Sequence, residues 1–329
     1  ASDYEVTTHL RSVELDGKVI IDVGDVEQTR YVIEAGKVQV ITEGCDVLFH
    51  RPPTMKSLPT IASEGSLERL REYINLSLED YWLIVAFITF ALANSHNPNV
   101  ILVIQGVAGS GKSFLCQMLQ SLLDPSDLKG QVFPSSVSDF VILCQSSKLI
   151  CIDNIRDIPK KWSDIICISS TSGTLATRQL YTNDGLHVHQ INVNLILNGI
   201  HPFITQTDLS ERCLTIKLPV LPEEERQSPQ QLLKKFNEDR PVIFKGLLEL
   251  IAEVVVHLPT VELTHKERMV AFCEWLAAIE LATDQPIGSL QASYSKNLKD
   301  AQLDALGENP LAMAVIALAT LDTAKPFSD

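Results

Sequence analysis

The stretch that decides the fold is Ile101–Leu122, ILVIQGVAGSGKSFLCQMLQSL. The apolar run Val100–Ile104 is typical of a buried strand, and an amphipathic helical pattern follows the glycine-rich segment at once. Between them, GVAGSGKS fits the phosphate-loop pattern G-x-x-x-x-G-K-[ST] without a mismatch. A chance glycine-rich turn is the alternative. The strand before it and the helix after it favour a nucleotide site instead.

Each residue type in this loop has a chemical reason. Glycines let backbone N–H groups turn inward around a triphosphate, and the N-terminus of the next helix faces the negative charge. Lys112 reaches the terminal phosphates, and the Ser113 hydroxyl can hold Mg²⁺. We therefore expect ATP and Mg²⁺ as cofactors. The residues predicted to bind ATP are Gly106, Val107, Ala108, Gly109, Ser110, Gly111, Lys112, Ser113 and Phe114.

Composition limits the class of protein. The chain has 329 residues, 45% hydrophobic and 21% charged, which suits two or three packed units. Its net charge of −14 repels nucleic acid over the surface as a whole, so contact with a phosphate backbone needs a local basic patch. Seven cysteines show no C-x-x-C spacing and no zinc-type cluster, which predicts free thiols in a reducing cytosol.

No apolar run is long enough to span a bilayer, the longest being Tyr81–Ala93, and no secretory signal is present. The prediction is a soluble, cytoplasmic protein without a membrane partner. Because the chain begins with Ala1 rather than Met, we expect it to be part of a longer protein.

The N-terminal stretch predicts a small antiparallel unit. Two pairs of alternating segments flank Asp16-Gly17 and Ala35-Gly36, and each pair is typical of a β-hairpin. Prolines 52, 53 and 59 then mark a linker. We therefore divide the chain into a β-rich segment with its linker (1–60), a nucleotide-binding core (61–221) and a helical domain (222–329). The β-rich segment is interpreted as a structural or partner-docking appendage.

Helix signals flank and follow the core. Ser77 with Asp80 forms a capping signature before a helix that is apolar nearly all round, and Thr264 with Glu267 forms another. The predicted helices are Ser66–Asn75, Ser77–Asn94, Ser136–Cys144, Ser163–Ser170, Ser228–Glu238, Pro241–His257, Thr264–Ala282, Leu290–Leu306 and Asn309–Leu321.

Two later strands carry polar residues at their carboxyl ends. Lys148–Ile152 is followed by Asp153, which is placed to hold Mg²⁺ opposite Ser113, with one crossover helix and one further strand in between. Val193–Leu197 is followed by Asn198, whose amide can orient an attacking water. Each has a plainer alternative, namely a turn aspartate and a turn asparagine before a glycine.

The order GVAGSGKS, LICIDN, an ATRQLY hairpin, NLILNG and DLSERCLTIKLP resembles the core of superfamily 3 type helicases. More closely, it resembles the primase-associated AAA+ ATPases of phages, plasmids and integrated mobile elements. The resemblance covers roughly residues 66–258 and implies an α/β P-loop AAA+ fold of ASCE type with a C-terminal helical lid. It makes Lys112 and Ser113 Walker A, Asp153 Walker B and Asn198 sensor 1. Arg212, just before the strand Cys213–Leu218, becomes an arginine finger.

The same resemblance gives the hairpin 178–190 a role in a ring's central channel. Arg178, Tyr181, His187 and His189 offer a cation, an aromatic face and hydrogen-bond donors for following single-stranded DNA. They can equally be ordinary strand residues.

One departure concerns the residue after Asp153. AAA+ proteins usually place a catalytic glutamate there, but this chain has Asn154, and an amide cannot accept the proton. Asn154 can position water while a carboxylate such as Asp157 assists, or hydrolysis can be slow.

The function expected from these observations is an ATP-driven ring helicase, a hexamer, acting in mobile-element or phage DNA replication. A primase or polymerase domain, on the same chain or a partner, is a further expected partner. The alternative is a slowly hydrolysing, ATP-switched initiator or loader scaffold that binds DNA. A small-molecule kinase would place its phosphate loop near the N-terminus and carry an arginine-rich lid, and neither is apparent.

Overall fold

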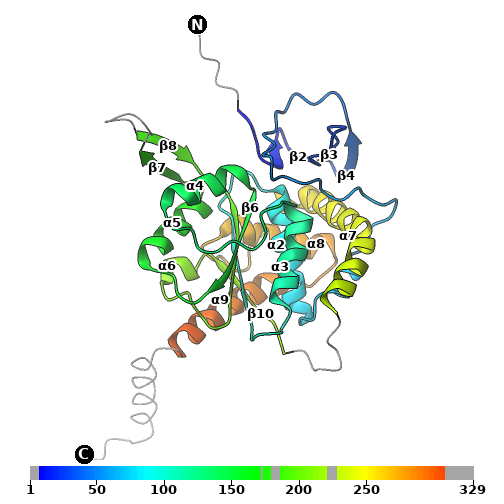
Figure 1. Cartoon of the computed structure of the whole chain (residues 1–329). Coiled ribbons are helices and arrows are strands. Elements are labelled where there is room, and N and C mark those ends of the chain that lie inside the picture. The colour runs from blue at the N-terminus through cyan, green and yellow to red at the C-terminus, as the bar shows by residue number, and fades with distance from the viewer. Residues whose placement is uncertain (1–6, 172, 179–185, 221–227, 308–329) are drawn as a thin grey trace, which may run out of the picture.

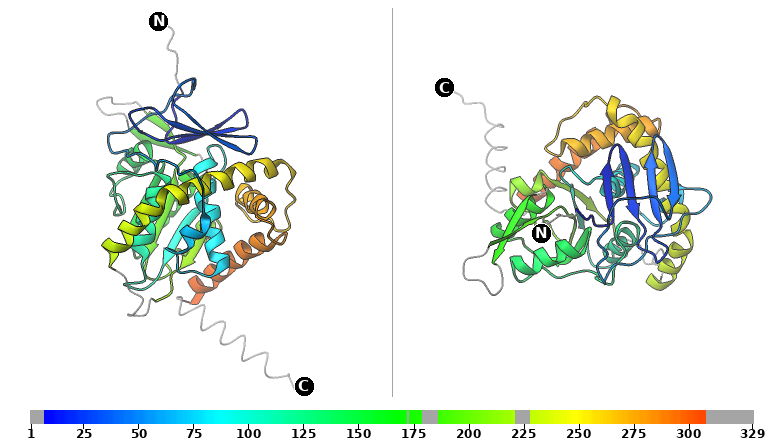
Figure 2. Two further views of the ribbon diagram at one scale, coloured as in Figure 1. Left: turned by 90° about the vertical axis from the view of Figure 1, so that its right-hand side faces the viewer. Right: turned by 90° about the horizontal axis from the view of Figure 1, so that it is seen from above.

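The computed structural model describes residues 7–171, 173–178, 186–220 and 228–307. A parallel sheet lies between two layers of helices, and a separate antiparallel sheet packs over one end of them (Figures 1 and 2). In the ranges described, no helix combines the length and apolar character needed to cross a bilayer.

The N-terminal sheet consists of four strands in chain order, β1 to β4. Its strands are β1 Ser12–Leu15, β2 Lys18–Asp22, β3 Arg30–Glu34 and β4 Lys37–Ile41. Both residues of each tight turn have positive φ, 52° and 74° at Asp16-Gly17 and 49° and 76° at Ala35-Gly36. Turns with two left-handed residues match the right-handed twist of paired strands. Both predicted hairpins are confirmed.

The central sheet contains four parallel strands in the order β10-β5-β9-β6. They are β5 Ile101–Gln105, β6 Leu149–Ile155, β9 Asn194–Gly199 and β10 Cys213–Lys217. β9 lies between β5 and β6, so the carboxyl ends of these three strands meet at one edge of the sheet. Polar residues that follow them are thereby brought together.

Helices cover both faces of this sheet. Side chains of β5 alternate between two hydrophobic clusters: Leu102 and Ile104 face one layer, Ile101 and Val103 the other. The first layer holds α1 Leu67–Arg71, α2 Leu78–Ala93, α3 Lys112–Leu123, α7 Pro229–His257, α8 Val270–Ala282 and α9 Ser289–Gly307. The second holds α4 Val137–Ser146, α5 Lys160–Ser170 and α6 Thr207–Ser210. A short 3-10 turn, Leu258–Thr260, follows α7.

The N-cap predicted at Ser77 is confirmed, and Ser136 forms a second one that the sequence analysis did not name. The Ser77 hydroxyl accepts a hydrogen bond from the Asp80 amide at 3.1 Å, and Ser136 does the same for Asp139 at the start of α4. Each cap satisfies one of the amide groups that a helix leaves without a partner at its start.

The predicted break before Pro241 is wrong, because α7 is one helix with this proline inside it. An interior proline costs about 3 kcal/mol. Two features offset that cost. Phe236 and Phe244 on either side of the proline both pack into the main cluster, and the Pro241 and Val242 carbonyls accept hydrogen bonds from Ala62 and Ser66, at 3.3 and 3.1 Å.

The capping box at Thr264 is also wrong, because α8 begins only at Val270. The Thr264 amide instead donates to Gln291 at 2.9 Å, and Glu267 accepts from Ser295, both in α9. α1 is shorter than predicted and ends at Arg71. The predicted helix 309–321 lies outside the described residues.

The helices predicted as a lid, α7 to α9, share one hydrophobic cluster with α2 and the central sheet. Asn297 of α9 also pairs with the open edge of β10, accepting from the Thr215 amide at 2.9 Å and donating to its carbonyl at 2.6 Å. An exposed strand edge is thus covered by a helix.

Candidate nucleotide site

The phosphate loop follows β5, and its glycines are required by geometry. Gly111 is the N-cap of α3 with φ of 89°, and Gly109 has φ of 81°. A Cβ on Gly106 would lie 2.6 Å from Ser110 Oγ and 3.1 Å from the Leu218 carbonyl. Any side chain there would collide with the loop or with the chain after β10.

Lys112 is turned back over its own loop. Its ammonium donates to the Gly106 carbonyl at 2.6 Å and to the Val107 carbonyl at 3.0 Å. Phe114, in the next turn, packs edge-on against Phe236 of α7, with ring centroids 6.4 Å apart. The sequence assigns both residues to nucleotide binding; the structure places Lys112 in the loop and Phe114 against the helical layer.

A cavity of about 160 Å³ joins the start of α3 to the carboxyl ends of β6 and β9. Ser113, Asp153 and Asn198 all line it, as the sequence pattern requires. The strand predicted between α3 and β6 is reduced to one bridge. In it, the Gln131 carbonyl accepts from the Asp153 amide at 2.8 Å, which fixes the backbone of that aspartate.

Two buried polar atoms at this site have no partner. Asn198 is 1% exposed, its amide nitrogen lies 3.7 Å from Cys116 Sγ, and its Oδ1 accepts nothing. Ser110, 5% exposed in the loop, has an unpartnered Oγ. A buried polar group without a hydrogen bond costs about 1–3 kcal/mol, and a nucleotide with its attacking water would supply partners to both atoms.

Cys116 lies on the wall of this cavity, one turn after Ser113. Burial, and then the charge of Asp153, raises the pKa of its thiol to about 12. The thiol therefore stays protonated at neutral pH and is a poor nucleophile. Like the other six cysteines, it forms no disulfide.

Asn154 is exposed and does not line the cavity. It has φ of 59° and lies at a bulge, where the pairing of β6 with β9 shifts register between Ile152 and Ile155. Asparagine is among the few residues that adopt this left-handed conformation readily. The local backbone thus gives a physical reason for an amide where AAA+ proteins usually carry glutamate. Asp157 is exposed as well.

Arg212 lies at the amino ends of the parallel strands, whereas its own loop lies at their carboxyl ends. Its carbonyl accepts from the Ile101 amide at 2.9 Å, at the amino end of β5. The side chain is only 12% exposed, its Nε has no partner, and Nη2 is 3.5 Å from Asp208. Arg268 holds the same Asp208 carboxylate at 2.7 Å and Glu211 at 2.9 Å. A Cys167 hydrogen bond, and then the two arginines, lower the pKa of Asp208.

The predicted hairpin is present as β7 Thr174–Arg178 and β8 Leu186–Gln190, which pair antiparallel. β8 leads into the amino end of β9, so the hairpin extends from the same sheet edge as Arg212. His189 contacts Gln145 of α4 at 2.9 Å. Tyr181 and the tip lie outside the described residues, as do the side chains of Arg178 and His187.

Residues 66–304 match the family described as actinomycete integrative conjugative element replication protein. The chain belongs to this family. A role in DNA replication is therefore supported independently of the site. No curated protein gave a match.

Solved structures of the NrS-1 C-terminal region align with part of this chain. An A-form apo structure aligns with a TM-score of 0.44 and 14% identity, covering 70% of this chain and 66% of that one. A second A-form apo structure, of residues 305–718, gives 0.42 and 12%, covering 69% and 66%. A further apo structure of the same region gives 0.42 and 14%, covering 72% and 71%. The chain thus spans slightly less than two thirds of the first two.

Sequence reasoning missed seven of the residues that line the cavity of this replication protein: Cys116, Gln117, Gln120, Lys129, Gly130, Cys151 and Ile152. Helical spacing could have identified Cys116, because it is one turn after Ser113 and lies on the same face of the helix. Lys129 and Gly130 carry no pattern. They reach the cavity only because the bridge at Gln131 ties their loop to β6.

Proposed function

We propose that this replication protein is an ATP-hydrolysing motor of the superfamily 3 AAA+ type that assembles as a hexameric ring and translocates on single-stranded DNA. The observation that carries the proposal is the cavity beside the phosphate loop. Ser113, Asp153 and Asn198 meet there, and two buried polar atoms at the loop lack partners. Membership in a replication family of conjugative elements supports the biological setting.

The residues present fit ATP and Mg²⁺. Ser113 and Asp153 would hold the metal through a hydroxyl and a carboxylate, and the described residues offer no cluster of three acidic, His or Cys ligands. Magnesium ATP supplies a γ-phosphoryl group to which water can add. With ATP bound, Lys112 would exchange its two carbonyl partners for phosphate oxygens, the Ser110 hydroxyl would gain a partner, and the Asn198 amide would orient the water.

Assembly as a ring is supported by the position of Arg212. An arginine at the amino ends of the strands, opposite its own loop at their carboxyl ends, cannot reach its own γ-phosphate, so it would act on a neighbouring subunit's site. It must first leave Asp208. Because Arg268 already neutralises that carboxylate at 2.7 Å, the release costs little.

DNA contact is assigned to the hairpin 178–190 at the same edge. A protein with a charge of −14 needs a localised contact with the phosphate backbone, and a projecting hairpin supplies one. The residues proposed for it are Arg178, Tyr181, His187 and His189.

A second candidate function is an ATP-switched initiator or loader scaffold that turns over slowly. Asn154 favours it, because its side chain is exposed, lies off the cavity and cannot act as a base. The two functions differ in whether hydrolysis drives strand separation.

The experiment that tests the proposal measures ATP hydrolysis and unwinding of a forked duplex by the wild type and by Lys112→Ala. We expect Lys112→Ala to lose both activities and to keep its fold, because in the free protein the ammonium bonds only to two carbonyls of its own loop. Lys161→Ala, an exposed lysine in α5, is the matched control and should behave as wild type. Full turnover by Lys112→Ala rejects the ATP site, and hydrolysis without unwinding replaces the motor with the scaffold.

A further inference from the structure

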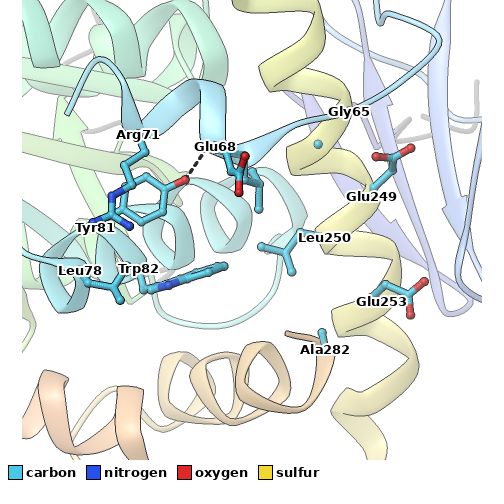
Figure 3. A pocket seen from close by; sticks show the side chains of 12 residues that line it. Gly65, Glu68, Arg71, Leu78, Tyr81, Trp82, Glu249, Leu250, Glu253 and Ala282 are labelled. Carbon is cyan, nitrogen blue, oxygen red and sulfur yellow. Dashed lines mark hydrogen bonds between the residues drawn. The ribbon is translucent and has the colours of Figure 1, made fainter. Parts of the chain in front are cut away.

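A second and larger cavity, of about 460 Å³, lies between α1, the start of α2, the second half of α7 and the end of α8 (Figure 3). One wall is formed where the backbone before α1 crosses the backbone of α7. A Cβ on Gly65 would lie 2.5 Å from the Gly246 amide nitrogen, so the segment before α1 touches α7 directly. No residue of the nucleotide site lines this cavity.

The floor of this α2–α7 cavity is aromatic and aliphatic. Tyr81 and Leu250 are 3% and 6% exposed, and the half-buried Trp82 indole extends across the cavity towards Leu250 (Figure 3). Tyr81 is already engaged, because its hydroxyl donates to the Leu67 carbonyl at 2.6 Å and the Arg71 guanidinium lies 5.9 Å from its ring centre. The aromatic surface offered to a ligand is therefore mainly Trp82.

The rim of the cavity is acidic. Glu68, Glu249 and Glu253 contribute three carboxylates against the single guanidinium of Arg71. Glu249 pairs with Lys245 at 3.3 Å, but no ion pair in the described ranges engages Glu68 or Glu253. An indole beside surplus negative charge attracts a cation and repels a phosphate.

We propose that the α2–α7 cavity docks a lysine- or arginine-bearing segment of a partner protein. The apolar stem of the basic side chain lies on Trp82 and Leu250, and its charged end meets the indole face and the carboxylates of Glu68 and Glu253. Charge complementarity selects this occupant, because the whole chain carries −14 and the rim carboxylates of Glu68 and Glu253 have no ion-pair partner among the described residues. The proposal goes beyond the motor function and does not depend on it.

The test titrates the full chain into a short fluorescein-labelled peptide of alternating arginine and alanine, followed by anisotropy at about 0.15 M salt. We expect Trp82→Ala and the double variant Glu68→Gln/Glu253→Gln each to weaken binding about tenfold or more. The matched control is Glu27→Gln/Glu43→Gln, which removes the same charge from exposed positions outside the cavity and should change affinity less than about twofold.

Three results overturn the proposal. One is no binding to the wild type, and another is equal weakening by both glutamate pairs, which means general attraction to an acidic surface. The third is displacement of the peptide by ADP in Lys112→Ala, which assigns the cavity to a nucleotide. If Trp82→Ala unfolds, the glutamate pair decides the matter alone, because both carboxylates are exposed and their loss leaves the core intact.

Discussion

Two buried polar regions of this molecule differ in whether their polar atoms have hydrogen-bond partners within the chain. At the joint between the N-terminal sheet and the core, Arg11 is 0% exposed, and its Nε donates to Asp124 at 3.0 Å. Its other nitrogens donate to four backbone carbonyls, and the second Asp124 oxygen accepts from the Lys148 and Leu149 amides. At the nucleotide site, by contrast, Ser110 Oγ and Asn198 Oδ1 are equally buried and have no partner.

This difference in hydrogen bonding distinguishes a region that stabilises the fold from one that is proposed to bind a ligand. A buried charge whose partners all lie within the chain is satisfied, and removing one partner of the pair destabilises the fold. A buried polar atom without a partner costs stability in the free protein, and a bound ligand can supply the missing hydrogen bond. We therefore assign the joint to stability and propose that the loop and Asn198 act on a bound nucleotide. Replacing residues in each region tests that division.

The largest effect on stability is expected at the joint. Asp124→Ala leaves the Arg11 guanidinium buried without its counter-charge, which should lower the free energy of unfolding by about 3–5 kcal/mol. Asp127→Ala, which removes an exposed partner of Lys56 at 2.7 Å, is the control and should cost less than about 1 kcal/mol. Urea unfolding of both variants measures the difference. Equal losses of unfolding free energy in the two variants would mean that the buried pair stabilises the fold no more than the exposed one.

The second test uses two asparagines of one strand, β9. Asn198→Leu removes a group without a full set of partners, so the free energy of unfolding should stay unchanged or rise, while ATP hydrolysis falls by about 10²-fold. Asn194→Leu instead removes the hydrogen bond to the Lys148 carbonyl at 3.3 Å. It should lower the free energy of unfolding by about 1–2 kcal/mol and leave hydrolysis intact. The opposite pattern contradicts the assignment of Asn198.

The smallest effect concerns pH. Burial lowers the pKa of Lys148 from its usual 10.5 to about 8, although Asp124 opposes the shift. Between these values the unfolded chain binds more protons than the folded one, so the free energy of unfolding rises with pH through this window. The wild type should gain stability from pH 8 to 10.5 relative to Lys148→Met. A flat or falling difference would mean that the ammonium is solvated.

The sequence predicts that Ser113, Asp153 and Asn198 come together, but it does not predict the joint, because the two depend on contacts of different sequence range. GVAGSGKS is a local pattern, and Asp153 and Asn198 each follow an apolar run that predicts a strand, so parallel pairing alone brings them together. The Arg11–Asp124 pair spans 113 residues without any periodic signal, and only the docked sheet reveals it.

Local rules failed where tertiary contacts outweighed them. Pro241 marks a helix boundary by propensity, but packing of Phe236 and Phe244 carries α7 through it. Thr264 and Glu267 have the spacing of a capping box, yet their hydrogen bonds go to α9. The left-handed backbone of Asn154 depends on a bulge against β9, which no sequence pattern near position 154 announces.

The central claim, an ATP site completed by a neighbouring subunit, is tested most directly by mixing two inactive proteins. Arg212→Ala should lose hydrolysis by about 10³-fold or more and still bind ATP, because the guanidinium acts only across the interface. Lys112→Ala keeps its Arg212 but cannot use its own loop. In an equal mixture, about one quarter of the interfaces would pair an intact loop with an intact finger. Recovery of hydrolysis to about that fraction of the wild-type rate is the result we predict. A mixture as inactive as its two components, although the wild type hydrolyses ATP, would contradict the shared site.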